Sequence, residues 1–256
     1  MHKFFTPAEN INDMSATIIG DDVKHIYKVL RLQEGEKIII NNLLGKEYLG
    51  EISSITKTEV VANIIEELQN NNESPIEINL FQGLPKAQKM DLIVQKGTEL
   101  GIKKFFPVIT SRVDVKLKGE FKKLDRLKRI ALEAAKQSKR SLIPEVYEPM
   151  DFDSMISVIK DYDLFIVPYE NAENYGIKNL VKDLSEKASI DKVKRIGIII
   201  GPEGGFEEEE IEKLKINNAV VVTLGNRILR TETAGFVTTS VLQYELGDLG
   251  GNIKWK

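Results

Sequence analysis

The fold class of this chain is decided by the stretch IGIIIGPEGGF, which runs from Ile196 to Phe206. The apolar run that ends at Ile200 is typical of a strand buried on both faces of a sheet. The glycines after it allow backbone conformations, and a close approach of a ligand, that other residues do not. A second loop, LGNRILRTETA from Leu224 to Ala234, again joins an expected strand to an expected helix. Because ligands bind beyond the carboxyl ends of strands in open α/β sheets, the two loops together predict a binding cleft.

Both loops also have simpler interpretations, which the sequence leaves open. IGPEGGF is short and is equally consistent with a tight turn between a strand and a helix. It matches neither the dinucleotide-binding pattern nor a Walker loop, since no Gly-Lys-Ser or Gly-Lys-Thr follows it. In the second loop, Arg227 and Arg230 are candidates for ligand binding or for ion pairs with Glu203 or Glu232.

The segments around these loops alternate between strands and helices, which predicts a parallel α/β sheet. The expected strands cover residues 76–81, 105–109, 164–167, 196–200 and 220–224, and the expected helices cover residues 86–100, 121–137, 207–215 and 233–246. The N-terminal part differs, because strands predominate and one helix begins at Asp21; this pattern predicts a small barrel. Its expected strands cover residues 16–19, 37–40, 48–55 and 60–64.

The stretch QNNNESP, residues 69–75, interrupts the apolar periodicity as interdomain linkers do. Residues 1–74 carry seven basic and twelve acidic side chains, whereas the remainder carries 29 basic and 27 acidic side chains. The change in pattern and in charge predicts two domains, a barrel over residues 1–72 and an α/β domain over residues 73–256.

The composition excludes several classes of protein. The 36 basic and 39 acidic side chains give a formal net charge of −3, which excludes a polycationic tail. Without cysteine the chain has no disulfide, no thiolate zinc site and no cysteine nucleophile, and with only His2 and His25 we expect no metal site. No apolar run approaches the length of about 18 residues that spans a membrane, and the N-terminus lacks a signal-peptide core. We therefore expect a cytoplasmic protein that does not act at a membrane.

Residues 116–140 carry ten basic and three acidic side chains, an excess that is typical of phosphate-backbone binding. A solvated helix face is the alternative interpretation. A smaller basic stripe, His25, Lys28 and Arg31, lies on the expected N-terminal helix. The candidate phosphate contacts within the longer run are Lys122, Lys123, Arg126 and Arg129.

In the combination of its motifs the whole chain resembles the RsmE family of ribosomal RNA (uridine-N3) methyltransferases, which belongs to the SPOUT superfamily. Agreement motif by motif is a stronger argument than a similar fold alone. The motifs are VLR (Val29 to Arg31) after His25, GLPK (Gly83 to Lys86), KGTELGI (Lys96 to Ile102), EAAKQSKR (Glu133 to Arg140), IGPEGGF (Ile200 to Phe206) and LGNRILRTETA (Leu224 to Ala234).

The resemblance implies a PUA-like N-terminal barrel that helps to hold RNA, followed by a SPOUT-type parallel sheet with a C-terminal trefoil knot. It also implies a homodimer, S-adenosylmethionine as the methyl donor, and N3 of a uridine in 16S ribosomal RNA of the small subunit as the acceptor. The lack of cysteine agrees with a nitrogen acceptor, because methylation of a pyrimidine ring carbon usually needs a thiol nucleophile.

Carried over residue by residue, the resemblance places the methyl donor on three loops, each after an expected strand. The expected donor contacts are Pro168, Tyr169, Glu170, Ile200, Gly201, Pro202, Glu203, Gly204, Gly205, Leu224, Gly225, Ile228 and Leu229. The candidates around the target base are Arg112, Gln137, Arg140 and Arg230.

Two of these arginines and two acids are candidates for catalysis. We expect Arg230 or Arg112 to stabilise the uracil anion, and Glu203 or Glu232 to accept its proton. The position directly before Arg112 departs from the family pattern, since Ser111 stands where relatives often have glutamate. A second departure is Lys139, where glycine is common.

Three other functions remain open. The first is a sister SPOUT RNA methyltransferase that acts on another base or on a ribose hydroxyl. The second is a non-catalytic RNA binder in ribosome assembly, and the third is a protein that binds a different nucleotide through IGPEGGF. Donor binding and the identity of the methylated nucleoside would distinguish them.

Overall fold

The computed structural model describes residues 1–69, 72–114 and 121–251, and its chain forms two compact units. The first unit contains Met1–Glu73 together with Ala135–Ile143, and the rest of the chain forms the second unit. Residues 70 and 71 of the expected linker lie outside the described residues. Nothing in the sequence pattern indicated that a later segment returns to the first unit.

The first unit is built on a curled five-stranded sheet, which is consistent with a PUA-like domain. Its strands, in the order β1–β3–β4–β5–β2, are β1 Lys3–Phe5, β3 Lys37–Asn41, β4 Glu47–Ile55, β5 Glu59–Leu68 and β2 Ser15–Ile19. β1 runs parallel to β3, and the other neighbours are antiparallel. Apolar side chains that alternate along these strands, Ile18, Ile38 and Ile40 among them, are completely buried.

The helix expected from Asp21 is only partly α-helical. α1, Asp21–Lys24, continues into a π-helical segment, η2, His25–Leu30, which ends at Arg31 with a left-handed backbone (φ 55°). Val23 and Ile26 of this segment are buried against the sheet of the first unit. The wider turn changes the spacing of the exposed side chains, so the basic stripe does not follow α-helical geometry.

A buried polar cluster ties Ala135–Ile143 into the first unit. Oε1 of Glu47 accepts hydrogen bonds from Lys3 Nζ (2.5 Å), Asn41 Nδ2 (3.1 Å) and Ser141 Oγ (2.6 Å). The Glu47 and Lys3 side chains are only 6% and 9% exposed. Each buried polar atom of this pair therefore depends on a partner inside the protein.

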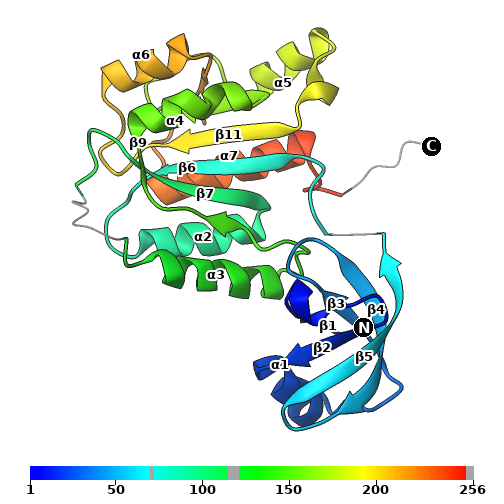
Figure 1. Cartoon of the computed structure of the whole chain (residues 1–256). Coiled ribbons are helices and arrows are strands. Elements are labelled where there is room, and N and C mark those ends of the chain that lie inside the picture. Colours follow the sequence, from blue (N-terminus) through cyan, green and yellow to red (C-terminus); the bar gives the residue numbers. More distant parts are fainter. Residues whose placement is uncertain (70–71, 115–120, 252–256) are drawn as a thin grey trace. The chain divides into compact units, whose positions relative to one another are not determined.

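The second unit is an α/β domain with a parallel sheet, which confirms the expected fold class (Figure 1). Its main strands, in the order β12–β10–β11–β6–β7–β8, are β12 Val220–Val222, β10 Leu164–Pro168, β11 Arg195–Ile200, β6 Glu77–Gly83, β7 Ile102–Ile109 and β8 Glu145–Val146, and β9 Met150–Asp151 pairs with β7. The helices are α2 Lys89–Glu99, α3 Leu124–Gln137, α4 Phe152–Val158, α5 Ile177–Glu186, α6 Glu208–Ile216 and α7 Thr231–Leu246. α4, α5 and the two short β8 and β9 strands lie where the sequence had no expected element.

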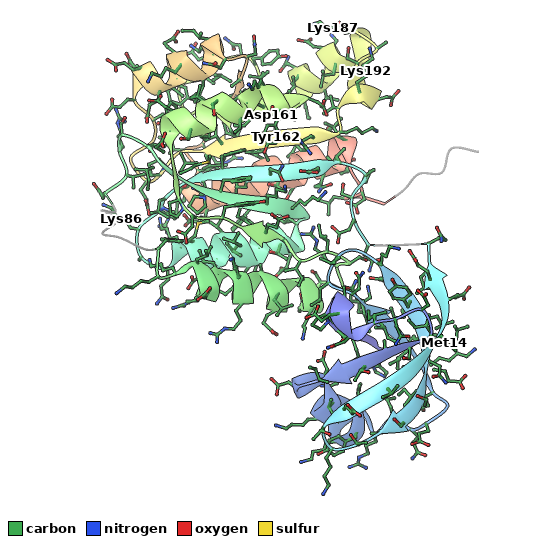
Figure 2. All side chains as sticks on the ribbon, in the orientation of Figure 1. Met14, Lys86, Asp161, Tyr162, Lys187 and Lys192 are labelled. Carbon is green, nitrogen blue, oxygen red and sulfur yellow. The ribbon has the colours of Figure 1, made fainter. Side chains whose placement is uncertain are left out.

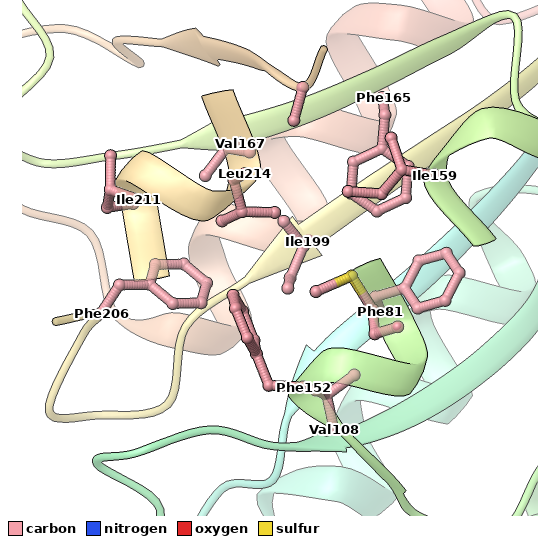
Figure 3. Close-up of a cluster of buried hydrophobic side chains, with 12 residues drawn as sticks. Phe81, Val108, Phe152, Ile159, Phe165, Val167, Ile199, Phe206, Ile211 and Leu214 are labelled. Atoms are coloured by element: carbon pink, nitrogen blue, oxygen red, sulfur yellow. The ribbon is translucent and has the colours of Figure 1, made fainter. Parts of the chain in front are cut away.

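The hydrophobic core between the sheet and the helices α4 and α6 explains why β11 is an almost continuous run of apolar residues (Figure 3). Ile199 of β11 packs in a buried cluster with Phe81, Phe165 and side chains of α4 and α6. Gly197 interrupts the run because a Cβ there would lie 2.2 Å from a ring carbon of Phe165. α7 contacts β11 and α2, and in Figure 1 these two helices cover the other face of the sheet. Both faces of the central strands are therefore buried.

Candidate functional site

The loops after β10, β11 and β12 meet at the carboxyl end of the sheet and enclose a pocket of about 800 Å³. The start of α7 and Lys89 of α2 complete its wall. Twelve of the thirteen expected donor contacts line the pocket, and Gly204 does not. The prediction that separate sequence loops form one cleft is thus confirmed as geometry, while the ligand contacts themselves stay predictions.

Two glycines let these segments approach closely. A Cβ on Gly83, at the end of β6, would lie 2.6 Å from the backbone nitrogen of Pro202. Gly205 has φ +70°, and a Cβ there would lie 2.9 Å from Oε1 of Glu170 on the β10 loop. A side chain at Gly83 would therefore displace the backbone of Pro202, and the left-handed backbone of Gly205 favours glycine.

A buried hydrogen-bonded chain joins three elements beneath the pocket. Gln82 of β6 is fully buried, and its Nε2 donates to Thr231 Oγ1 (2.8 Å) at the start of α7. Thr231 in turn donates to the carbonyl oxygen of Gly201 (2.6 Å). Neither Gln82 nor Thr231 was among the expected site residues. β6 also contains Glu77 and Asn79, so nothing in the sequence distinguished Gln82 from the other polar residues of the strand.

Lys89, also missed in the sequence, joins two of the candidate acids. Its Nζ lies 3.1 Å from Glu203 Oε1 and 3.4 Å from Glu232 Oε2. The backbone amide of Lys86 donates to the same Glu203 carboxylate (3.2 Å), and Figure 2 shows Lys86 at this end of the sheet. The signal for Lys89 was its place three residues after the GLPK motif.

These contacts keep the acid and the amine charged. Partial burial raises the pKa of Glu203, but hydrogen bonds from its own backbone amide, from Lys89 and from the Lys86 amide outweigh burial and leave that pKa below its usual value. The hydrogen bond to Glu203 raises the pKa of Lys89. Glu203 is therefore ionised at neutral pH and is a weaker base than an unpaired glutamate.

The two candidate catalytic arginines have different surroundings. Arg230 lines the pocket and is exposed, and its guanidinium has no hydrogen bond or ion pair with any residue that the structure describes. Arg112 lies outside this pocket and donates to both carboxylate oxygens of Glu207 (2.8 and 2.9 Å) and to the Gly204 carbonyl (2.8 Å). Arg230 is thus available to a ligand, whereas Arg112 holds the loop after β11.

The RNA-contact candidates in the first unit differ in their exposure to solvent. His25, Lys28, Arg31 and Gln137 are exposed. Arg140 is only 4% exposed, and its NH2 group lies 2.6 Å from Glu73 Oε2. Arg140 therefore has a structural partner in this unit, and its proposed contact with the target base stays a prediction.

The basic run is partly used within the second unit. Lys122 and Arg129 are exposed, whereas Lys123 Nζ donates to the Ala87 carbonyl and Arg126 pairs with Asp91 at 2.5 Å. Lys116 and Lys118 lie outside the described residues. Across the parts of the chain that the structure describes, we find no helix that is long and apolar enough to cross a membrane. In the same parts, no group of three or more His, Cys, Asp or Glu side chains is arranged to hold a metal ion.

Comparison with known proteins gives a consistent family assignment. A family model described as an RNA methyltransferase domain matches residues 72–243, and one described as an RNA methyltransferase PUA domain matches residues 18–65. The chain is 38% identical over 238 residues to ribosomal RNA small subunit methyltransferase E of Bacillus subtilis (strain 168), covering 92% of each protein. It is 31% identical over 244 residues to the enzyme of the same name from Aquifex aeolicus (strain VF5), covering 94% of this chain and 99% of that protein.

A solved structure agrees in fold and in name. The ribosomal RNA small subunit methyltransferase E from Neisseria gonorrhoeae, bound to S-adenosyl methionine, is 29% identical with a TM-score of 0.79. The match covers 97% of this chain and 99% of that chain. The resemblance drawn from the motifs is confirmed, and the chain belongs to the ribosomal RNA small subunit methyltransferase E family of RNA methyltransferases.

Proposed function

We propose that this protein transfers a methyl group from S-adenosylmethionine to N3 of a uridine in 16S ribosomal RNA of the small ribosomal subunit. The observation that carries the proposal is the convergence of three strand-end loops on one pocket, with Arg230 in its wall, whose guanidinium is unpaired among the described residues. The membership of the RNA methyltransferase family supports the reaction type.

The pocket suits such a donor in size and in chemistry. Its volume of about 800 Å³ falls within the range of ligand sites that enclose a drug-sized molecule. Ile200 and Leu229 offer apolar walls, while Glu170 and Glu203 offer carboxylates that can accept hydrogen bonds from hydroxyl and amino groups. When bound, S-adenosylmethionine supplies an electrophilic methyl group on a sulfonium.

The protein's own residues must prepare the acceptor nitrogen. N3 of uracil carries a proton and becomes nucleophilic only when that proton leaves. We assign Arg230 to stabilise the charge that develops on the uracil carbonyl oxygens, because its guanidinium is unpaired among the described residues. We assign Glu203 to receive the proton directly or through water, since its carboxylate lines the pocket, whereas Glu232 Oε2 is buried. Arg112 acts on the loop of Gly204 in this proposal.

The finer architecture is part of the same proposal. We assign residues 1–72 to a PUA-like RNA-binding domain, and residues 73–256 to a SPOUT methyltransferase domain whose C-terminal part forms a trefoil knot. We also assign a homodimer, supported by exposed apolar side chains on the neighbouring helices α2 and α7, where Leu92 is 42% and Tyr244 is 67% exposed. Sedimentation as a monomer at micromolar concentration would contradict the proposed homodimer. The cytoplasmic location stays a prediction.

The test of the proposed function is a labelling experiment. The protein is incubated with methyl-labelled S-adenosylmethionine and small ribosomal subunits that lack their native base methylation, and the digested RNA is analysed by nucleoside. Label in 3-methyluridine is the expected result. Label in another nucleoside would indicate a sister activity, and no label together with no donor binding would indicate a non-catalytic RNA binder.

RNA binding by the basic run is tested separately. Replacing the exposed Lys122 and Arg129 with glutamine should weaken RNA binding and reduce the slope of log K against log salt by about one for each phosphate that is no longer neutralised. Affinity for S-adenosylmethionine should not change, because neither side chain lines the pocket. An unchanged salt slope would remove these residues from the RNA interface.

A further inference from the structure

A glutamine inside the sheet has a bonding pattern that a purely structural residue does not need. Gln82 is completely buried, yet its Oε1 has no hydrogen-bond partner among the described residues. A buried acceptor without a donor is unfavourable, and an apolar side chain of similar size would avoid it. The position therefore calls for the amide for another reason.

The amide nitrogen has a fixed orientation. Nε2 donates both to Thr231 Oγ1 (2.8 Å) and to the carbonyl oxygen of Gly83 (3.0 Å). A flipped amide would place its oxygen against the Gly83 oxygen, so the nitrogen must face this side. Oε1 is then left facing α7, where a Cβ added to Gly235 would lie 3.9 Å from it.

This orientation sets the direction of the next hydrogen bond. The Thr231 hydroxyl has a single proton, and because Gln82 Nε2 can only donate, that proton remains for the Gly201 carbonyl (2.6 Å). The following residue, Pro202, has no N–H, so the Gly201 carbonyl is the only polar group of that peptide unit. Among the side chains that the structure describes, only Thr231 donates to this carbonyl, which belongs to the first peptide of the loop after β11.

We propose that Gln82 is a positioning residue for methyl-donor binding: it acts through Thr231 to fix the Gly201 carbonyl, and with it the Gly201–Gly205 loop of the pocket. The inference rests on the proposed function, because it takes this pocket as the donor site. Gln82 itself is not among the residues that line the pocket. Its effect passes through Thr231, which does line the pocket.

The test compares Gln82→Leu with a matched control, Gln243→Leu, near the C-terminal end of α7. Gln243 is also a buried glutamine (1% exposed) with an orphaned amide atom, Nε2, but its Oε1 accepts from Ser74 (2.7 Å), away from the pocket. Binding of S-adenosylmethionine is measured by titration calorimetry, thermal unfolding by circular dichroism, and exchange of the Gly204 and Gly205 amides without ligand. The wild-type titration alone decides whether the pocket binds the donor.

Gln82→Leu should weaken donor binding about tenfold, the equivalent of one net hydrogen bond. It should also speed exchange of the loop amides, while the unfolding midpoint stays the same or rises because the orphaned oxygen is gone. Gln243→Leu should leave donor affinity and loop exchange unchanged. Unchanged affinity and exchange in Gln82→Leu would overturn the proposal, as would a fall in the unfolding midpoint that matches the loss of affinity.

If Gln82→Leu does not fold, the test is made at Thr231, the next residue in the series of hydrogen bonds. Thr231→Val removes the hydroxyl and keeps the shape, whereas Thr231→Ser keeps the hydroxyl. Faster loop exchange in Thr231→Val than in Thr231→Ser supports the proposal, and equal exchange overturns it. Because exchange is measured without ligand, this result stands even if the wild-type protein fails to bind S-adenosylmethionine.

Discussion

The ion pair between Lys3 and Glu47 should be the main polar determinant of stability in the first unit. Glu47→Gln keeps an oxygen for Ser141 and Asn41 but leaves the Lys3 ammonium, 9% exposed, without a counter-charge. Breaking a buried pair in this way costs about 3 kcal/mol, and Lys3→Met should cost a similar amount for the opposite reason. Against a total stability of about 5–15 kcal/mol, either change would be a large loss.

The double variant separates pairing from mere burial. Lys3→Met with Glu47→Gln removes both charges and should cost only about 1–2 kcal/mol, for the lost hydrogen bonds of Lys3. The coupling energy should then be about 4–5 kcal/mol, above the range of about 0.5–3 kcal/mol that is usual for residues in contact. Hydrogen exchange of β3 and β4 amides measures it within this unit alone.

The control pair for this cycle is Lys46 and Glu67, whose side chains are 58% and 43% exposed. The same substitutions there should show no measurable coupling, because solvent screens an exposed pair. Additive effects of the Lys3 and Glu47 changes, within about 0.5 kcal/mol, would refute the reasoning, since independent sites behave in that way.

Three further predictions concern single residues. Lys139 has φ +57°, so Lys139→Gly should relieve about 1–2 kcal/mol of backbone strain. The added entropy of the unfolded chain should cost about 0.4–1 kcal/mol. The unfolding midpoint should therefore rise, and a lower midpoint would contradict this prediction. The pKa of Glu203 is lowered on folding, so its contribution to stability should be present above pH 4.5 and be lost as the pH falls through the pKa of the folded state. The difference in unfolding midpoint between the wild type and Glu203→Gln should therefore narrow as the pH falls below 4.5. A difference that stays constant with pH would contradict this prediction. Gly205→Ala should weaken binding of S-adenosylmethionine by at least tenfold, because the added Cβ would displace Glu170; calorimetry at wild-type affinity would exclude that steric role.

The sheet of the second unit was predictable because its signals are local. Ile196 to Ile200 reads as a buried strand, and the structure extends it by one residue, to Arg195–Ile200. α4 spans only seven residues, which is too short for a clear helical period, whereas α5 has apolar residues at Ile177, Leu180, Val181 and Leu184 and could have been predicted from the sequence. The π-helical form of His25–Leu30 and the return of Ala135–Ile143 to the first unit were not predictable, since both depend on tertiary contacts.

The candidate site was predictable where glycine and strand ends coincide. The loops at Gly201 and Gly225 were found in the sequence because such turns leave a compositional trace, and the structure brings them to one pocket. Lys89 and Gln82 left no such trace, because a lysine on a helix and a glutamine in a strand acquire roles only through distant partners. Arg112 and Arg230 looked equivalent as charges, and only the structure shows that Arg230 lines the pocket whereas Arg112 is bound to Glu207 and to the Gly204 carbonyl.

The return of Ala135–Ile143 to the first unit has a consequence for synthesis of the chain. Ribosomes make proteins from the N-terminus, so Lys3 and Glu47 leave the exit tunnel long before Ser141 is translated. Until then, Glu47 lacks one of its three donors and Glu73 lacks Arg140. The first unit can complete its interior only after more than half of the protein exists, because Arg140 and Ser141 follow α3, most of which belongs to the other unit. A nascent chain that stalls before this point would carry an unfinished polar interior.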